Sequence, residues 1–134
     1  MEIIEVCEVL ILDDKNRVLL QLRDKNPKIN GSAKWGVIGG SKELGESSLE
    51  CIKREVQEEL GLDIDPIFIN EIEDTGDNKI YRHFIYSLLY KGDIKSIFLK
   101  EGQEIRFFTL REIIELDTVE WFNRVYFSAI EKLI

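Results

Sequence analysis

The sequence is poor in several features that mark specialised classes of protein. Its 134 residues include only two prolines, two cysteines and one histidine, and Lys and Arg are outnumbered by Asp and Glu, 18 to 26. No apolar run approaches the roughly 18 residues that a transmembrane helix needs. The first residues, MEIIEVCEV, lack the positive segment and cleavage site of a signal peptide. We therefore expect a cytoplasmic protein that does not enter a membrane.

Cysteine content and charge narrow the function classes further. Cys7 and Cys51 are too few for a disulfide framework, so a reducing cytoplasm is the expected compartment, and Cys51 is expected to fill a small-residue position. The net charge of −8 argues against a surface for a nucleic-acid polymer, which needs clustered Lys and Arg. A small phosphorylated ligand remains compatible with this charge if a bound divalent cation inverts the local field.

Hydrophobic periodicity and turn residues predict an α/β protein with a mixed sheet. No repeat or low-complexity segment divides the chain, so we expect a single domain over residues 1–134. Strands are expected at 3–12, 18–23, 35–38, 67–74, 79–90 and 104–108, with the fourth and fifth forming a hairpin. Helices are expected at 48–60, just after Thr109, and at about 118–132, where apolar residues recur at helical spacing.

The 48–60 helix is framed by a capping box, Ser47 with Glu50, and by Gly61 at its end. It carries an apolar face and, beside it, three carboxylates at i+3 and i+4 spacing, Glu55, Glu58 and Glu59. Clustered carboxylates suit a hard cation such as Mg²⁺ or Mn²⁺. The alternative is an ordinary solvated helix face with its charges paired locally.

The spacing around this helix resembles the Nudix box, G-x5-E-x7-R-E-U-x-E-E-x-G-U, over residues 40–62. Gly40, Glu46 and Arg54 stand at the first fixed positions, and REVQEELGL, residues 54–62, fills the rest. One departure is Ile38, where most members of the family carry proline. Outside residues 40–62 the resemblance is loose.

This resemblance implies an α/β/α sandwich and the metal-dependent hydrolysis of a nucleoside diphosphate linked to another group X. It implies that Glu58 and Glu59 are the principal metal ligands, that Glu55 shares this role or positions the water, and that a carbonyl of Gly39 or Gly40 completes the coordination. Glu55 and Glu58 are thereby also candidate catalytic residues. Glu46 and Arg54 match the pair that orients the carboxylates.

Three further residues match positions of MutT-type members of the family. Glu101-Gly102-Gln103 resembles the loop whose glutamate reaches the metals, so Glu101 is a candidate ligand or base, with Glu104 as runner-up and a solvated loop glutamate as the alternative. Arg23 and Asn123 resemble residues that contact the base. The plainer interpretation is an exposed arginine and a helix-surface asparagine. His83 is interpreted as a packed or surface residue and not as a catalyst.

The resulting expectation is a Mg²⁺-dependent, MutT-like Nudix pyrophosphohydrolase, with Mn²⁺ as the other candidate metal. Its substrate would be a nucleoside triphosphate or a related small nucleotide, and the protein would be a monomer or a homodimer. Hydrolysis of an NDP-sugar or ADP-ribose is the nearest alternative. A catalytically silent nucleotide sensor is another, although none of the three helix carboxylates is missing. Hydrolysis of RNA ends is disfavoured by the acidic charge.

Overall fold

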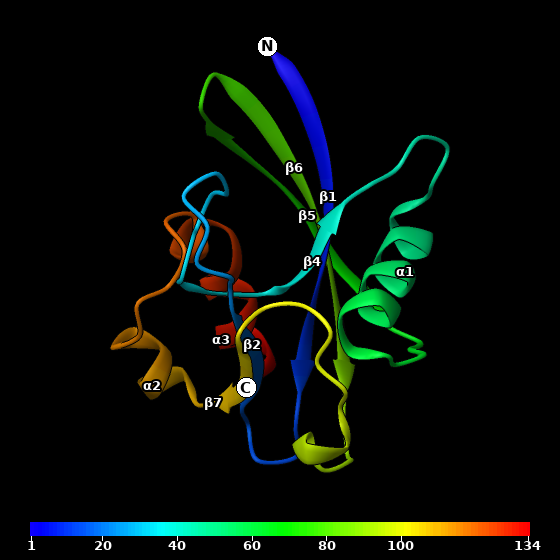
Figure 1. Cartoon of the computed structure of the whole chain (residues 1–134), viewed down its shortest axis with the longest axis vertical. Coiled ribbons are helices and arrows are strands. Elements are labelled where there is room, and N and C mark those ends of the chain that lie inside the picture. Colours follow the sequence, from blue (N-terminus) through cyan, green and yellow to red (C-terminus); the bar gives the residue numbers. More distant parts are fainter.

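The computed structural model describes residues 1–134 as a mixed sheet with helices on both faces (Figure 1). Its strands are β1 (Glu2–Leu12), β2 (Val18–Leu22), β3 (Trp35–Gly36), β4 (Ile38–Ser41), β5 (Ile67–Gly76), β6 (Lys79–Leu89) and β7 (Glu104–Phe108). Its helices are α1 (Ser48–Leu60), the 3₁₀ turn η1 (Ile94–Ser96), α2 (Leu110–Ile114), the π-helical turn η2 (Asn123–Phe127) and α3 (Ser128–Leu133). The expected elements are therefore present.

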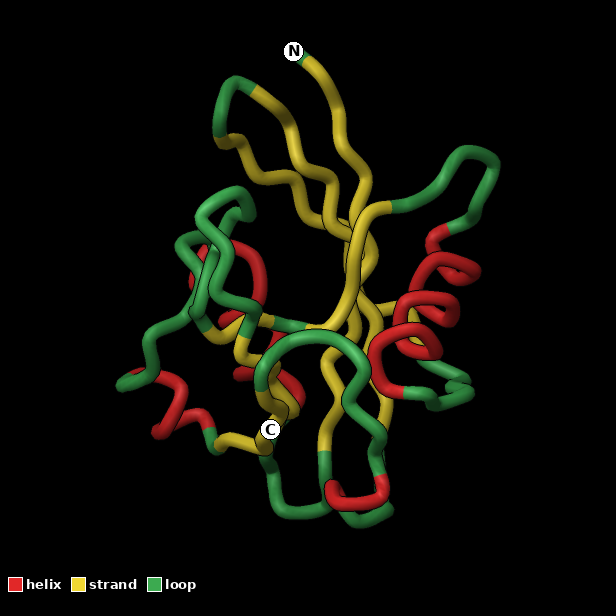
Figure 2. Tube along the Cα trace, viewed as in Figure 1, coloured by secondary structure: helices red, strands yellow, loops and turns green.

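Strand β1 organises the sheet, whose strand order is β3-β2-β1-β6-β5. It pairs in parallel with β6 along its whole length, from Glu2 opposite Lys79 to Leu12 opposite Leu89. Its other edge is shared between β2 and the short β4, both antiparallel to it, while β7 pairs with β2. Strands β5 and β6 form the expected hairpin, whose tip and the N-terminus reach the same end of the molecule (Figure 2).

Two apolar cores, one on each face of the sheet, confirm the α/β/α arrangement. Because side chains alternate along a strand, Val9 and Ile11 of β1 pack toward α1, whereas Leu10 packs toward η2 and α3. On the α1 side the helix contributes the buried residues Ile52, Val56 and Leu60. On the other side α2 contributes Ile113, and the last helical segment contributes Phe122, Val125, Tyr126, Ala129 and Ile130, at the expected helical spacing.

Helix α1 begins and ends where its sequence predicts. The Ser47 side chain accepts a hydrogen bond from Glu50 N, and the Glu50 side chain accepts one from Ser47 N. Gly61 ends the helix in the left-handed conformation, with φ of 67°, and donates its N–H to Gln57 O. The capping box and terminal glycine therefore fix the span that carries the carboxylates.

The last helix starts later than expected. Thr118 is not helical, because it forms an isolated bridge with Trp35. Asp117 O accepts from Trp35 N and Val119 N donates to Trp35 O, so this segment acts as a short extension of the sheet edge. The helical turns follow, beginning with η2. The expected span 118–132 was therefore wrong by about one turn at its start.

Cys7 of β1 and Cys51 of α1 are joined by a disulfide bond, with a Cα–Cα distance of 6.3 Å. The expectation that two cysteines would form no disulfide framework, and that Cys51 merely fills a small-residue position, is corrected here. The bond instead ties the carboxylate helix to the centre of the sheet. No helix of the chain is long and apolar enough to cross a membrane.

Candidate active site

The paired glycines of β4 bring α1 against the sheet. Gly39 lies opposite Glu8 of β1, and Gly40 lies opposite Cys7. A β-carbon at Gly39 would lie 2.1 Å from Cys7 O, and one at Gly40 would lie 2.5 Å from the carboxylate carbon of Glu55. Only glycine allows both approaches, so the α1 carboxylates reach the β4 backbone directly.

Four carboxylates line a cavity of about 270 Å³ beside these glycines. Glu55 and Glu59 come from α1, Glu101 comes from the loop before β7 and Asp24 from the loop after β2, and Gly39 and Gly40 also line it. Glu59 is only 3% exposed, and its Oε2 is buried with no hydrogen-bond partner. Burial, followed by the charges of Glu101 and Glu55, raises the pKa of Glu59 to about 9. Burial also raises the pKa of Glu55. The cavity is therefore a concentration of poorly compensated negative charge.

These residues fit a divalent cation. A buried carboxylate oxygen without a partner, two further carboxylates and nearby backbone carbonyls form the hard-oxygen donor set that Mg²⁺ and Mn²⁺ prefer. As they stand, the side chains do not converge in a group of three or more that could hold an ion. Coordination would therefore need side-chain rotations, which exposed Glu101 can make readily.

Glu58 is placed differently from the sequence expectation. Its side chain is 57% exposed, its Oε2 lies 3.2 Å from Arg54 Nη1, and it lines neither cavity of the site. Residues 55 and 59 are one helical turn apart and both turn inward, which rotates the intervening Glu58 toward solvent. The Glu58 side chain therefore lies outside the carboxylate cavity, and its roles as metal ligand and catalytic residue stay predictions.

Arg54 connects the start of the box to the carboxylates. It donates two hydrogen bonds to Glu46, from Nε at 2.7 Å and from Nη2 at 3.0 Å. It also donates to Glu55 Oε1 at 2.9 Å and to Ser41 O at 3.1 Å. The hydrogen bond from Arg54 lowers the pKa of Glu46 to about 2. Arg54 therefore links Glu46 to Glu55, and the orienting role that the resemblance implies for this pair stays a prediction.

The loop that carries Glu101 is fastened to β2. Gln21 Nε2 donates to Glu101 O at 2.7 Å, and Gln103 Nε2 donates to Arg23 O at 2.8 Å. Gly102 has φ of 86°, and a β-carbon there would lie 2.7 Å from Gln21 Nε2. The loop thus holds Glu101 at the cavity. Glu104 pairs instead with Arg106 and lines neither cavity, and its role as the runner-up stays a prediction.

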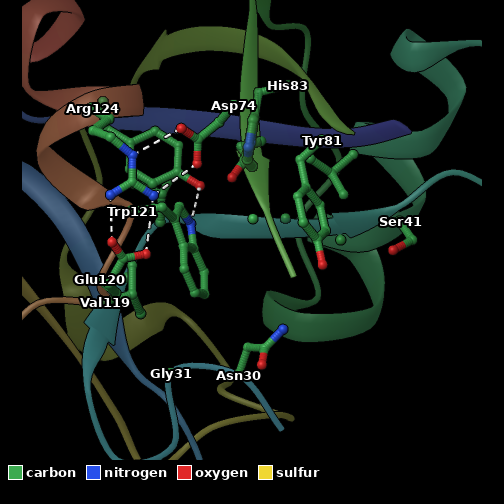
Figure 3. Close-up of a pocket in the computed structure, with 18 of the residues that line it drawn as sticks. Asn30, Gly31, Ser41, Asp74, Tyr81, His83, Val119, Glu120, Trp121 and Arg124 are labelled. Atoms are coloured by element: carbon green, nitrogen blue, oxygen red, sulfur yellow. Dashed lines mark hydrogen bonds and ion pairs between the residues drawn. The ribbon is translucent and has the colours of Figure 1, made fainter. Parts of the chain in front are cut away.

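A second cavity, of about 460 Å³, adjoins the first on the α3 face of the sheet (Figure 3). Arg23, Gly39 and Gly40 line both cavities and form the junction between them. Trp121 and Tyr81 supply aromatic surface. The other labelled residues of the wall include Asn30, Ser41, Asp74, Glu120 and Arg124, of which the last three form one ion-pair cluster.

Of the two expected base-contact residues, only Arg23 reaches a cavity. Asn123 is exposed and lines neither cavity, as the plainer interpretation of a helix-surface asparagine expects, and its contact with the base stays a prediction. The second cavity also contains Glu8 and His83, two buried residues that the sequence analysis did not select. The signal for both in the sequence was weak, because other polar residues, such as Glu5 of β1 and Arg82 of β6, stand in the same strands.

Comparison with known proteins agrees with this geometry. A family model described as NUDIX domain matches residues 4–130. Solved structures with the same fold include the MutT protein of Methanosarcina mazei Go1, which is 24% identical with a TM-score of 0.82 and covers 98% of this chain and 95% of its own. The NUDIX domain of Shewanella oneidensis NrtR, complexed with ADP ribose, is 14% identical with a TM-score of 0.79 over 100% of this chain and 90% of its own.

The dihydroneopterin triphosphate pyrophosphohydrolase of E. coli is 22% identical with a TM-score of 0.71, over 97% of this chain and 94% of its own. At these identities the neighbours show the fold and do not determine a substrate. The family model covers nearly the whole chain, and every fixed position of the box is filled. The chain therefore belongs to the Nudix family of pyrophosphohydrolases, which generally use divalent metal ions.

Proposed function

We propose that this protein is a Mg²⁺-dependent pyrophosphohydrolase that acts on a nucleoside triphosphate, or on another nucleoside diphosphate linked to X, and releases a nucleoside monophosphate. The observation that carries this proposal is the junction at Gly39 and Gly40. It joins a small carboxylate cavity, suited to cations and a diphosphate, to a larger cavity suited to a nucleoside.

Glu55, Glu59 and Glu101, with a carbonyl of Gly39 or Gly40, are the residues that would hold the metal. When bound, a divalent cation neutralises the diphosphate and lowers the pKa of an attacking water. Arg54 holds Glu55 in place through a hydrogen bond of 2.9 Å and leaves Glu59 without a cationic partner. Arg23 lies at the junction, where its guanidinium can face the phosphates. A carboxylate that does not ligate the metal can accept the proton of the water.

The test is product release from a panel of nucleoside triphosphates, NDP-sugars and ADP-ribose, with Mg²⁺ and with Mn²⁺. We expect Glu59→Gln to lose at least about 100-fold in kcat, because it removes a charged ligand while keeping shape. Glu131→Gln, the same change on the exposed face of α3, is the matched control. Glu58→Gln tests the difference between the structure and the sequence expectation. Because Glu58 is exposed and lies outside the cavity, this variant should lose less kcat than Glu59→Gln, whereas a principal metal ligand should lose as much.

Turnover by Glu59→Gln at the wild-type rate would contradict the assignment of the carboxylate cavity. If the wild-type protein turned over no member of the panel while still binding nucleotide, the proposal of hydrolysis would fall and the silent sensor would replace it.

A further inference from the structure

The floor of the larger cavity contains a buried, hydrogen-bonded couple, Glu8 of β1 and His83 of β6. Glu8 Oε1 lies 2.7 Å from His83 Nδ1, and the two residues are 7% and 4% exposed. The register pairs His83 with Val6, so Glu8 and His83 share the α3 face of the sheet. His83 also packs edge-on against Tyr126, with ring centroids 6.0 Å apart.

Stability does not account for this couple. Its neighbours on the same face of β1 and β6, Leu10 and Ile85, belong to the apolar core. A buried ionic pair is on average no more stabilising than well-packed apolar side chains of the same volume. An apolar pair would therefore serve the fold equally well here, and the polar groups call for another explanation.

Each member of the couple has one polar atom to spare. Glu8 Oε2 and His83 Nε2 have no hydrogen-bond partner in the protein, yet neither is sealed from solvent, unlike Glu59 Oε2. Both residues line the larger cavity, so these two atoms open into it (Figure 3 shows His83). A ligand in the cavity would meet a carboxylate oxygen and an imidazole nitrogen side by side.

The other charges around the cavity are already engaged. Arg124 donates to both oxygens of Asp74, at 2.8 and 2.9 Å, and also pairs with Glu120. Arg23 donates to Asn30 O at 3.1 Å and faces the junction with the carboxylate cavity. Asp77, at the hairpin tip, adds one more negative charge to the rim. The free polar atoms at the floor therefore favour a ligand that presents N–H donors.

We propose that Glu8 and His83 select the nucleobase, and that they favour bases with an exocyclic amino group over their carbonyl counterparts. This inference rests on the proposed function, since it names the substrate class of the same site. An amino N–H donates to Glu8 Oε2, while the adjacent ring nitrogen of the base accepts from His83 Nε2–H. Trp121 and Tyr81 offer the flat surfaces against which the base can lie (Figure 3).

A carbonyl at the same place would leave the carboxylate oxygen facing an acceptor. Sites built to hydrogen-bond a substrate group reject analogues that lack it strongly, because a polar group of the site is then left unpaired. We therefore expect the wild-type protein to prefer CTP over UTP and ATP over ITP, each by at least about tenfold in kcat/KM. Within each pair an exocyclic amino group is replaced by a carbonyl, and the adjacent ring nitrogen changes from an acceptor to a donor.

The experiment measures kcat and KM for both pairs in wild type, Glu8→Gln and His83→Phe. Glu8→Gln keeps the shape of the side chain but supplies an N–H donor. The ratio of kcat/KM for the amino nucleotide to kcat/KM for its carbonyl counterpart should therefore fall to near one or below one, mainly through KM. Glu5→Gln is the matched control, because it lies on the same strand, on the opposite face and outside both cavities. Thermal unfolding of each variant reports whether the fold is kept.

Binding of CMP and UMP by calorimetry separates this inference from the proposed function. Tighter binding of CMP by wild type and not by Glu8→Gln would support base selection even if no nucleotide were hydrolysed. Equal kcat/KM within both pairs for wild type, or an unchanged preference in folded Glu8→Gln, would overturn the proposal.

Discussion

The bond between Cys7 and Cys51 gives a prediction whose size can be worked out from its position. The cysteines are 44 residues apart in the sequence, and both are fully buried. Cross-linking a loop of that length removes denatured-state entropy worth about 4 kcal/mol at 25 °C in the chain-entropy model. For a chain of 134 residues this corresponds to roughly 14 °C in Tm.

The perturbation is a set of three variants, Cys7→Ala, Cys51→Ala and the double variant. Either single change already breaks the cross-link, so the free energy of unfolding of each single variant should fall by nearly the whole of about 4 kcal/mol. The double variant should then lose little more than either single variant. If the two thiols were not linked, each single variant would lose only a small free energy of unfolding from its own packing. The double variant would then lose the sum of the two.

Urea unfolding measured with and without a dithiol reductant checks both expectations. The reductant should lower the midpoint of wild type to that of the double variant and leave the variants unchanged. The unfolded, unreduced wild-type protein should show no reactive thiol, since neither cysteine is free. Two reactive thiols in that state, or additive single losses, would refute the reasoning.

Three further predictions concern other parts of the structure. Gly40→Ala places a β-carbon 2.5 Å from the Glu55 carboxylate, so kcat should fall about 100-fold with the fold retained; unchanged kcat would show that Glu55 need not lie there. The hydrogen bond from Arg124 lowers the pKa of Asp74, so this carboxylate stabilises the protein above its unfolded pKa near 3.8 and less as pH falls. The Tm deficit of Asp74→Asn should therefore shrink between pH 5 and about 2, and a constant deficit would contradict it. Ile52→Ala removes a fully buried side chain between α1 and the sheet and should cost about 2–5 kcal/mol in urea unfolding, whereas a loss below about 1 kcal/mol would mean that this core is not packed as described.

Local patterns in the sequence predicted the strands and helices and the part of the site that lies within residues 40–62. The capping box and Gly61 determine α1 by contacts within one turn, so its bounds could be read directly. The pairing of Arg54 with Glu46 spans eight residues and follows from the spacing of the box. The order of the expected strands and helices predicted a mixed sheet with helices covering its faces.

Contacts between distant segments could not be predicted in the same way. Which carboxylate turns inward depends on how closely β4 approaches α1, and this left Glu58 outside the cavity. Glu8 and His83 are 75 residues apart, and only the parallel pairing of β1 with β6 brings them together. The disulfide depends on the same packing of β1 against α1, and the position of Asn123 depends on the turn η2.

The junction at Gly39 and Gly40 has a consequence for how such a protein can diverge. Gly39 lies opposite Glu8, and a β-carbon at Gly40 would meet Glu55, so the two ends of the site are separated by the two glycines of β4. If the larger cavity holds the nucleoside as proposed, substitutions on the α3 face of β1 and β6 change which nucleoside is held and leave the carboxylates of α1 in place. Specificity could then change by point mutation of the cavity floor without loss of these carboxylates.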